Sequence, residues 1–99
     1  GGVSDYALSP RARLDLSDIW DYTAEHWSVD QADGYVRQIT DACAEVASGR
    51  SVGQRIDHIR AGYFRYPAGS HVLYYRWDGS GRMEVIRILH QRMDVGRHL

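Results

Sequence analysis

The sequence predicts an α+β domain with the order β-α-α-β-β-β: an N-terminal strand, a two-helix antiparallel hairpin, and a small, mostly antiparallel sheet on which the hairpin packs. Apolar residues recur at helical spacing as far as residue 46. From residue 63 onward they occur instead in short runs of aromatic and β-branched residues, which are typical of strands. Glycines and prolines mark the ends of these segments. A length of 99 residues provides for a single domain over residues 1–99.

The first half of the chain contains the predicted N-terminal strand and both helices. Residues 3–8 are predicted to form a short strand, and Ser9-Pro10 to start the first helix, because Ser accepts from free N–H groups and Pro fits the first helical position. Ser28 and Gln31 form a capping box that opens the second helix, and Gly49 closes it. The apolar positions of the two helices are Ala12, Leu16, Ile19, Trp20, Thr23 and Trp27, then Ala32, Tyr35, Val36, Ile39, Cys43 and Val46.

The second half of the chain carries the rest of the sheet. Residues 50–61 read as a loop that could include a short strand around Ile56. The main feature is a hairpin, in which two strands rich in aromatic and branched residues flank a Gly-rich connection. The predicted segments are a strand at Tyr63–Tyr66, a turn at Pro67–Gly69, strands at His71–Trp77 and Met83–His90 joined by Asp78–Gly81, and a polar tail at Gln91–Leu99.

Both faces of the two long strands are substantially apolar. Strict alternation groups Leu73 and Tyr75 on one face and Val72 and Tyr74 on the other; it also groups the residues of the last strand as Met83, Val85, Arg87 and Leu89 against Glu84, Ile86, Ile88 and His90. One helical layer covers only one face, so we expect a partner polypeptide to cover the other. The alternative cover is the tail or the 50–61 loop.

Composition and charge exclude several classes of protein. The net charge is -1, with 12 basic and 13 acidic residues, and all of the basic residues are Arg. This balance excludes a disordered chain and a strongly basic nucleic-acid binder. The sequence shows neither a run of ~20 apolar residues nor a signal peptide, which predicts a cytoplasmic protein without a membrane segment. Gly1 and Gly2 could be remnants of an expression tag.

The near-zero total conceals a division along the chain. Residues 1–49 carry three Arg against nine acids, whereas residues 50–99 carry nine Arg against four acids. A basic sheet could therefore face an acidic partner, although mutual neutralisation across the fold is the alternative.

The residue pattern predicts neither a metal site nor a cofactor. The five His residues lack metal-ligand spacing, and Cys43 lies on the apolar stripe of a helix, where an inert thiol is usual. No Gly-rich phosphate loop precedes a helix. The remaining enzymatic option is metal-free RNA cleavage by His90 with the arginines of the basic half, which include Arg60, Arg65, Arg76, Arg87 and Arg92.

Several motifs in order carry a family resemblance over about residues 5–94. They are Tyr6–Pro10 before a helix with Asp18–Tyr22, Trp27 before a helix with Ala32 and Tyr35, then Ile59–Arg65, and finally Arg87–Asp94. The chain resembles the ParE-type toxins of bacterial type II toxin–antitoxin modules, in the RelE/ParE superfamily. The resemblance implies a non-enzymatic inhibitor of DNA gyrase that blocks replication and is silenced by a tightly bound ParD-type antitoxin. It implies no sequence-specific nucleic-acid binding by the toxin alone.

Two alternatives to gyrase inhibition stay open. The RelE branch of the superfamily cleaves ribosome-bound mRNA, but Val72 stands where that branch has a basic residue, and the last residues, Val95–Leu99, lack its Tyr. The other alternative is an inactive relative that retains only antitoxin binding.

The resemblance also directs the choice of candidate residues. We expect large aromatic and Arg side chains to anchor the antitoxin, namely Trp20, Trp27, Tyr74, Arg76 and Arg87. The two Trp residues could instead be core of the hairpin, whereas the two Arg residues could pair with acidic antitoxin side chains by forked hydrogen bonds. For gyrase inhibition the candidates are His90, Arg92, Met93 and Asp94, which could alternatively fix the end of the last strand.

Overall fold

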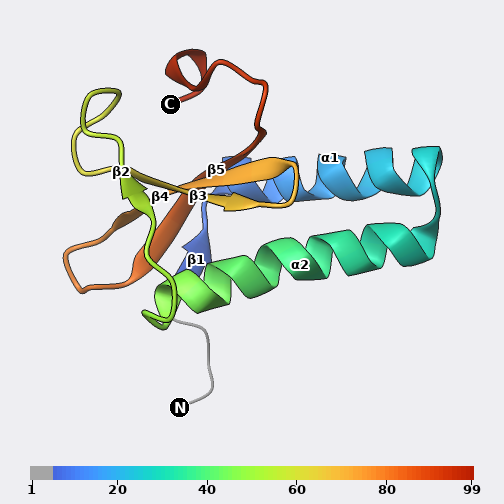
Figure 1. Ribbon diagram of the computed structural model, residues 1–99, viewed down its shortest axis with the longest axis horizontal. Helices are drawn as coiled ribbons and strands as arrows, with labels where there is room; N and C mark the ends of the chain where they lie inside the picture. The colour runs from blue at the N-terminus through green and yellow to red at the C-terminus, as the bar shows by residue number, and fades with distance from the viewer. Residues whose placement is uncertain (1–5) are drawn as a thin grey trace.

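Two long helices form an antiparallel hairpin in the computed structural model, which describes residues 6–99 (Figure 1). Helix α1 spans Pro10–His26 and α2 spans Val29–Ala47. The predicted caps are confirmed: the Ser9 hydroxyl accepts from the Ala12 N–H at 3.0 Å, and the Ser28 hydroxyl accepts from the Gln31 N–H at 3.0 Å. Gly49 has a φ of 84°, as expected of a residue just past a helix end.

The sheet has five strands in the order β1-β5-β4-β3-β2. Their bounds are Tyr6–Leu8 (β1), Gln54–Arg55 (β2), Phe64–Ala68 (β3), His71–Trp77 (β4) and Met83–His90 (β5). β1 pairs with β5 in parallel, and the other pairings are antiparallel. The predicted α+β class and the hairpin at residues 71–90 are confirmed. Of the strand predicted at 3–8, residues 3–5 lie outside the described part of the chain.

The turn predicted at Pro67–Gly69 is wrong by two residues. Pro67 and Ala68 belong to β3, where they pair with Val72 and His71 of β4. β2 reaches only Phe64 and Arg65 on the other side of β3, so Pro67 removes no donor from that ladder. The chain reverses at Gly69, whose φ of 62° and contact with the ring of Tyr35 leave no room for a side chain.

β5 contains a bulge that the alternation prediction missed. Tyr74 pairs with Arg87 but Tyr75 pairs with Val85, which leaves Ile86 as an extra residue. The bulge lies beside the start of α1, where the Ser9 hydroxyl donates to the Ile86 carbonyl at 2.7 Å. As a result, Ile88 rather than Arg87 and Leu89 shares a face with Met83 and Val85.

The helix face, the side of the sheet on which the helices pack, carries the larger core. Its buried residues are Ala12, Ile19, Ile39, Cys43, Val46, Ala68, Leu73, Tyr75, Met83, Val85 and Ile88. Cys43 is fully buried, and burial raises the pKa of its thiol to about 12. This agrees with the predicted inert cysteine.

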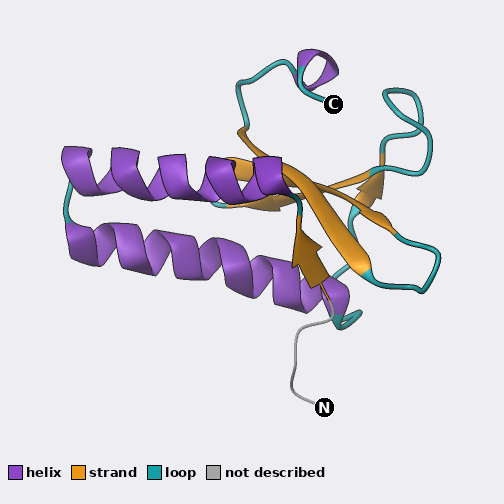
Figure 2. Ribbon diagram, turned by 180° about the vertical axis from the view of Figure 1, so that it is seen from behind, coloured by secondary structure: helices purple, strands orange, loops and turns teal. Residues whose placement is uncertain are grey.

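The opposite side of the sheet, here the tail face, is covered by the chain itself. Its buried residues are Ile56, Tyr63, Val72, Tyr74 and Leu89, with Ile86, Val95 and Leu99 packed against them. Ile56 comes from the β2–β3 loop, and the last two come from the tail, which forms the 3₁₀ helix η1 (Val95–Arg97). Figure 2 shows the loop and the tail together at the top of the view. The expectation that a partner polypeptide covers this face is therefore corrected, because the tail and the β2–β3 loop of the chain itself cover it.

Candidate binding groove

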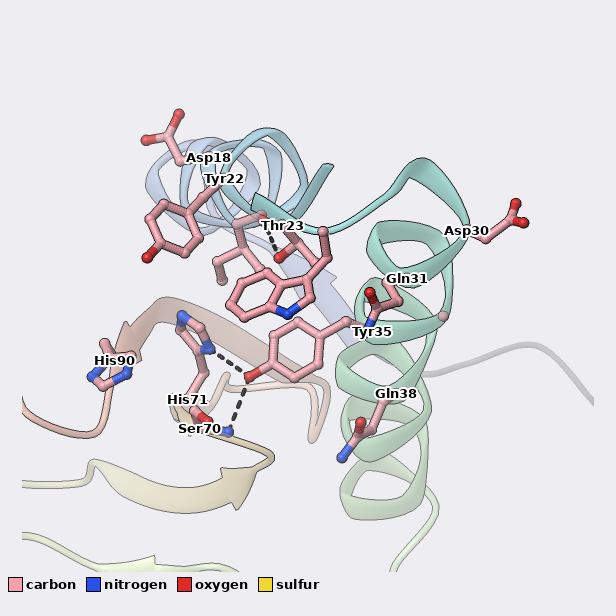
Figure 3. Close-up of a pocket in the computed structure, with 13 residues that line it drawn as sticks. Asp18, Tyr22, Thr23, Asp30, Gln31, Tyr35, Gln38, Ser70, His71 and His90 are labelled. Carbon is pink, nitrogen blue, oxygen red and sulfur yellow. Dashed lines mark hydrogen bonds between the residues drawn. The ribbon is translucent and has the colours of Figure 1, made fainter. Parts of the chain in front are cut away.

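A groove of about 960 Å³ lies between the helix hairpin and the adjoining ends of β4 and β5 (Figure 3). Its helical wall contains aromatic, amide and acidic side chains, and its sheet end contains two imidazoles. The lining residues are Asp18, Ile19, Tyr22, Thr23, Trp27, Asp30, Gln31, Gly34, Tyr35, Gln38, Ser70, His71 and His90.

The Tyr35 hydroxyl connects α2 to the sheet end of the groove. It accepts from the Ser70 N–H at 3.0 Å and lies 2.6 Å from Nδ1 of His71, as the dashed lines in Figure 3 show. Burial and the neighbouring His90 lower the pKa of His71, and the charge of Asp15 opposes this shift in part. When Tyr35 donates to Nδ1 of His71, the proton of the neutral ring lies on Nε2.

His90 lies beside His71 at the end of the neighbouring strand. The two residues are cross-strand partners, and their rings meet edge to face with centroids 5.3 Å apart. Nδ1 of His90 accepts from the Arg92 N–H at 3.2 Å, which places its proton on Nε2 as well. Within residues 6–99, neither Nε2 atom has a hydrogen-bond partner.

An exposed aromatic cluster forms the hairpin end of the groove. Tyr22 stacks on His26 with ring centroids 3.8 Å apart, and Trp27 lies 6.3 Å from Tyr22. Trp27 is 62% exposed, so the alternative of a core role is wrong for this residue. Trp20 is half-buried and donates from Nε1 to Asp33 at 2.9 Å. It lines a separate groove of about 370 Å³ between α1 and α2.

The two candidate arginines are already paired with carboxylates of their own chain. Arg87 is nearly buried, and its guanidinium donates to both oxygens of Asp15 at 2.8 and 2.9 Å. Asp15 thus makes the forked pairing expected from an antitoxin, and it also accepts from the Ile88 N–H. Arg76 donates to Glu84 at 2.8 Å near the surface. With Tyr74 buried on the tail face, Trp27 alone of the proposed antitoxin anchors lines the 960 Å³ groove.

The four residues predicted for gyrase inhibition, between His90 and Asp94, lie in different surroundings. His90 lines the groove, whereas Arg92 and Met93 are exposed after the end of β5. Asp94 caps η1, since its carboxylate accepts from the Gly96 N–H at 3.1 Å and lies 3.8 Å from Arg97. Asp94 thus has a structural contact in the tail, at the start of η1, rather than at the end of β5.

Comparison with known proteins agrees with this architecture. The model of the family described as "ParE toxin of type II toxin-antitoxin system, parDE" matches residues 6–95, nearly the whole chain. The chain belongs to the ParE toxin family. It is 48% identical over 96 residues to Toxin ParE1 of Mycobacterium tuberculosis (strain ATCC 25618 / H37Rv), covering 97% of this chain and 98% of that toxin. It is 44% identical over 97 residues to Toxin ParE1 of Caulobacter vibrioides, covering 98% and 99%.

A solved structure of low sequence identity shows the same fold. A chain from the "Chromosomal ParDE TA system from P. aeruginosa" superposes with a TM-score of 0.74, at 16% identity, over 86% of this chain and 92% of that one. The strand, helix hairpin and sheet of this toxin are thus the architecture of that chain too.

Tyr35, Ser70 and His71 of this ParE-family toxin were missed as site residues. Tyr35 lies on the apolar stripe of α2, and this pattern does not reveal the contacts of its hydroxyl. A signal for the His pair was nevertheless present: His71 begins one predicted hairpin strand and His90 ends the other, and in an antiparallel hairpin these positions face each other.

The described residues contain no group of three His, Cys, Asp or Glu side chains that could hold a metal ion. The arginines invoked for RNA cleavage include Arg76 and Arg87, whose charges are neutralised by Glu84 and Asp15. Between residues 6 and 99 no helix is long and apolar enough to cross a membrane.

Proposed function

We propose that this ParE-family toxin inhibits DNA gyrase in the bacterial cytoplasm, so blocking replication and growth, and that a ParD-type antitoxin neutralises it by direct binding. The observation that carries the proposal is the family match over residues 6–95, together with relatives named Toxin ParE1 that align with nearly the full chain. The toxin then acts by binding, without catalysis, cofactor, membrane contact or sequence-specific binding to nucleic acid.

The 960 Å³ groove is the antitoxin site that the geometry supports best. Tyr22 and Trp27 expose large aromatic surfaces at one end, and aromatic side chains are the usual anchors of protein interfaces. The solved relative comes from a ParDE system, in keeping with an antitoxin partner for this chain. Of the antitoxin anchors considered from sequence, we retain Trp27 for this groove.

The exposed segment after β5 is the gyrase contact that we propose. Arg92 and Met93 expose a charged and an apolar side chain side by side, and neither has a partner in an ion pair or core cluster of the described chain. His90 borders both this segment and the groove, so an antitoxin in the groove could cover part of the gyrase contact.

A supercoiling assay tests the proposal. The purified toxin is expected to inhibit gyrase supercoiling and to accumulate cleaved DNA, and equimolar ParD-type antitoxin to restore supercoiling. Unchanged supercoiling at a large molar excess of folded toxin would refute gyrase inhibition. Cleavage seen by toe-printing of translated mRNA would then support the RelE-type alternative, and growth without arrest on expression would support an inactive relative.

A matched pair of arginine variants tests the gyrase contact. Arg92→Ala is expected to raise the toxin concentration that half-inhibits supercoiling by about 10-fold or more, the usual size of an interface anchor. Arg97→Ala removes an exposed arginine from η1 and should leave inhibition unchanged. Equal effects of the two substitutions would show that the segment acts only through its charge.

A further inference from the structure

We propose that His71 and His90 form a carboxylate-binding subsite, which receives one acidic side chain of the antitoxin segment that occupies the groove. The inference rests on the proposed antitoxin function and adds the chemistry of recognition. It departs from the expectation that Arg76 and Arg87 receive antitoxin carboxylates, because both are already paired within the chain.

The donors of this subsite are fixed by contacts on the opposite side of each ring. The Tyr35 hydroxyl accepts from the Ser70 N–H and, with its own proton directed at Nδ1 of His71, leaves the ring proton of His71 on Nε2. The Arg92 N–H is directed at Nδ1 of His90. Both imidazoles therefore present an Nε2–H donor, and backbone hydrogen bonds of the hairpin hold the two rings in edge-to-face contact.

Two Nε2–H donors on rings whose centroids lie 5.3 Å apart suit the two oxygens of a carboxylate better than a single carbonyl oxygen. A carboxylate also favours the charged form of His71, which makes its hydrogen bond charge-assisted and stronger. Tyr35 does not prevent this change, since its oxygen can accept from a protonated Nδ1 of His71.

Charge complementarity defines the rest of the occupant. Asp18 and Asp30 line the groove from α1 and α2, and a second acidic side chain beside them would be repelled. We therefore expect a segment with a carboxylate for the His pair, an apolar surface for Tyr22 and Trp27, and a basic side chain toward the helices.

The experiment compares two double variants of the toxin in binding to the ParD-type antitoxin of the same module, measured by calorimetry. An Asn amide occupies roughly the place of Nδ1, whereas a Gln amide reaches the place of Nε2. His71→Asn with His90→Asn thus keeps the inner contacts and removes both donors, and should weaken binding about 10- to 100-fold. His71→Gln with His90→Gln keeps neutral donors and should bind within about 3-fold of the unaltered toxin.

Acidification gives a second readout. The groups that face His71 are His90 from β5, Tyr35 from α2 and Asp15 from α1, and Asp18 and Asp30 line the same groove. A carboxylate bound beside His71 would oppose the lowering of its pKa, so antitoxin binding should be linked to the uptake of a proton by this imidazole. Antitoxin affinity for the unaltered toxin should rise about 3- to 10-fold between about pH 7.5 and 6.0, and the Gln variant should lose the rise.

Controls separate the subsite from the fold and from the proposed function. His58→Gln replaces an exposed histidine in the β2–β3 loop and should keep both the affinity and its pH dependence. Near-normal binding by the folded Asn variant, or a pH dependence that survives in the Gln variant, would overturn the subsite. If the Asn variant does not fold, double-mutant cycles at pH 6.0 combine the Gln variant of the toxin with a substitution of each acidic antitoxin residue in turn. The binding free energies should show coupling between the His pair and one of these acidic residues. Coupling to none of them would overturn the subsite.

An antitoxin that does not bind the unaltered toxin would refute the proposed neutralisation, and with it the subsite. Antitoxin binding that is insensitive to His71 and His90 would refute the subsite alone.

Discussion

The two faces of the sheet are buried by different kinds of structure. Two long helices cover the helix face, whereas a loop and a tail that ends in one 3₁₀ turn cover the tail face. Leu73 and Leu89, on neighbouring strands, are buried to a similar extent on opposite faces. Equal burial therefore does not imply equal rigidity, because a loop can move into a void more readily than a helix can.

Truncating each leucine tests this difference and should produce the largest effect. Leu73→Ala is expected to lower the free energy of unfolding by about 3–5 kcal/mol, because the helices cannot close over the cavity. Leu89→Ala is expected to cost about 2–3 kcal/mol, because the tail can settle into the space. Urea denaturation of both variants measures the difference. A larger loss from Leu89→Ala would mean that the tail face is the more rigid core.

The ion pairs extend the comparison from apolar to charged contacts. Asp15→Ala leaves Arg87 nearly buried without its carboxylate and the Ile88 N–H without its acceptor, so we expect a loss of about 2–4 kcal/mol in unfolding free energy. Glu84→Ala is the matched control, because its partner Arg76 is half exposed, and it should cost less than about 1 kcal/mol. Similar losses measured by thermal unfolding would show that the burial of Arg87 has no energetic consequence.

The smallest expected effect concerns the pH dependence of stability. Burial lowers the pKa of His71 in the folded toxin below its ordinary value of 6.5, so the unfolded chain binds a proton more readily. The contribution of neutral His71 to the free energy of unfolding is complete above pH 6.5, and it is lost as the pH falls toward the pKa of His71 in the folded toxin. Unfolding free energies of the unaltered toxin should therefore fall slightly more between pH 7.5 and 5.5 than those of His71→Gln. Parallel curves would show that His71 titrates alike in both states.

Local signals in the sequence predicted the elements that depend on neighbouring residues. The Ser9 and Ser28 caps, Gly49 and the hairpin at residues 71–90 were placed correctly, because caps and strand patterns act over a few residues. The bulge at Ile86 could not be predicted from alternation, because it accompanies a hydrogen bond from Ser9, a residue distant in sequence.

The site was predicted less well because its chemistry depends on tertiary pairing. Arg87 appeared free in sequence, but the fold brings Asp15 to it. Tyr35 appeared to be a core residue, but its hydroxyl reaches the turn at Ser70. The family resemblance supplied the toxin class, whereas the groove and its two imidazole donors emerged from the three-dimensional arrangement.

The parallel pairing of β1 with β5 makes completion of the toxin a late event in its synthesis. Tyr6–Leu8 leave the ribosome before both helices, whereas their partners Met83–Val85 are translated only after β4. Until then the helices lack β5, and the groove lacks His90. A nascent chain that has not yet reached β5 therefore carries neither the finished groove nor the segment after β5.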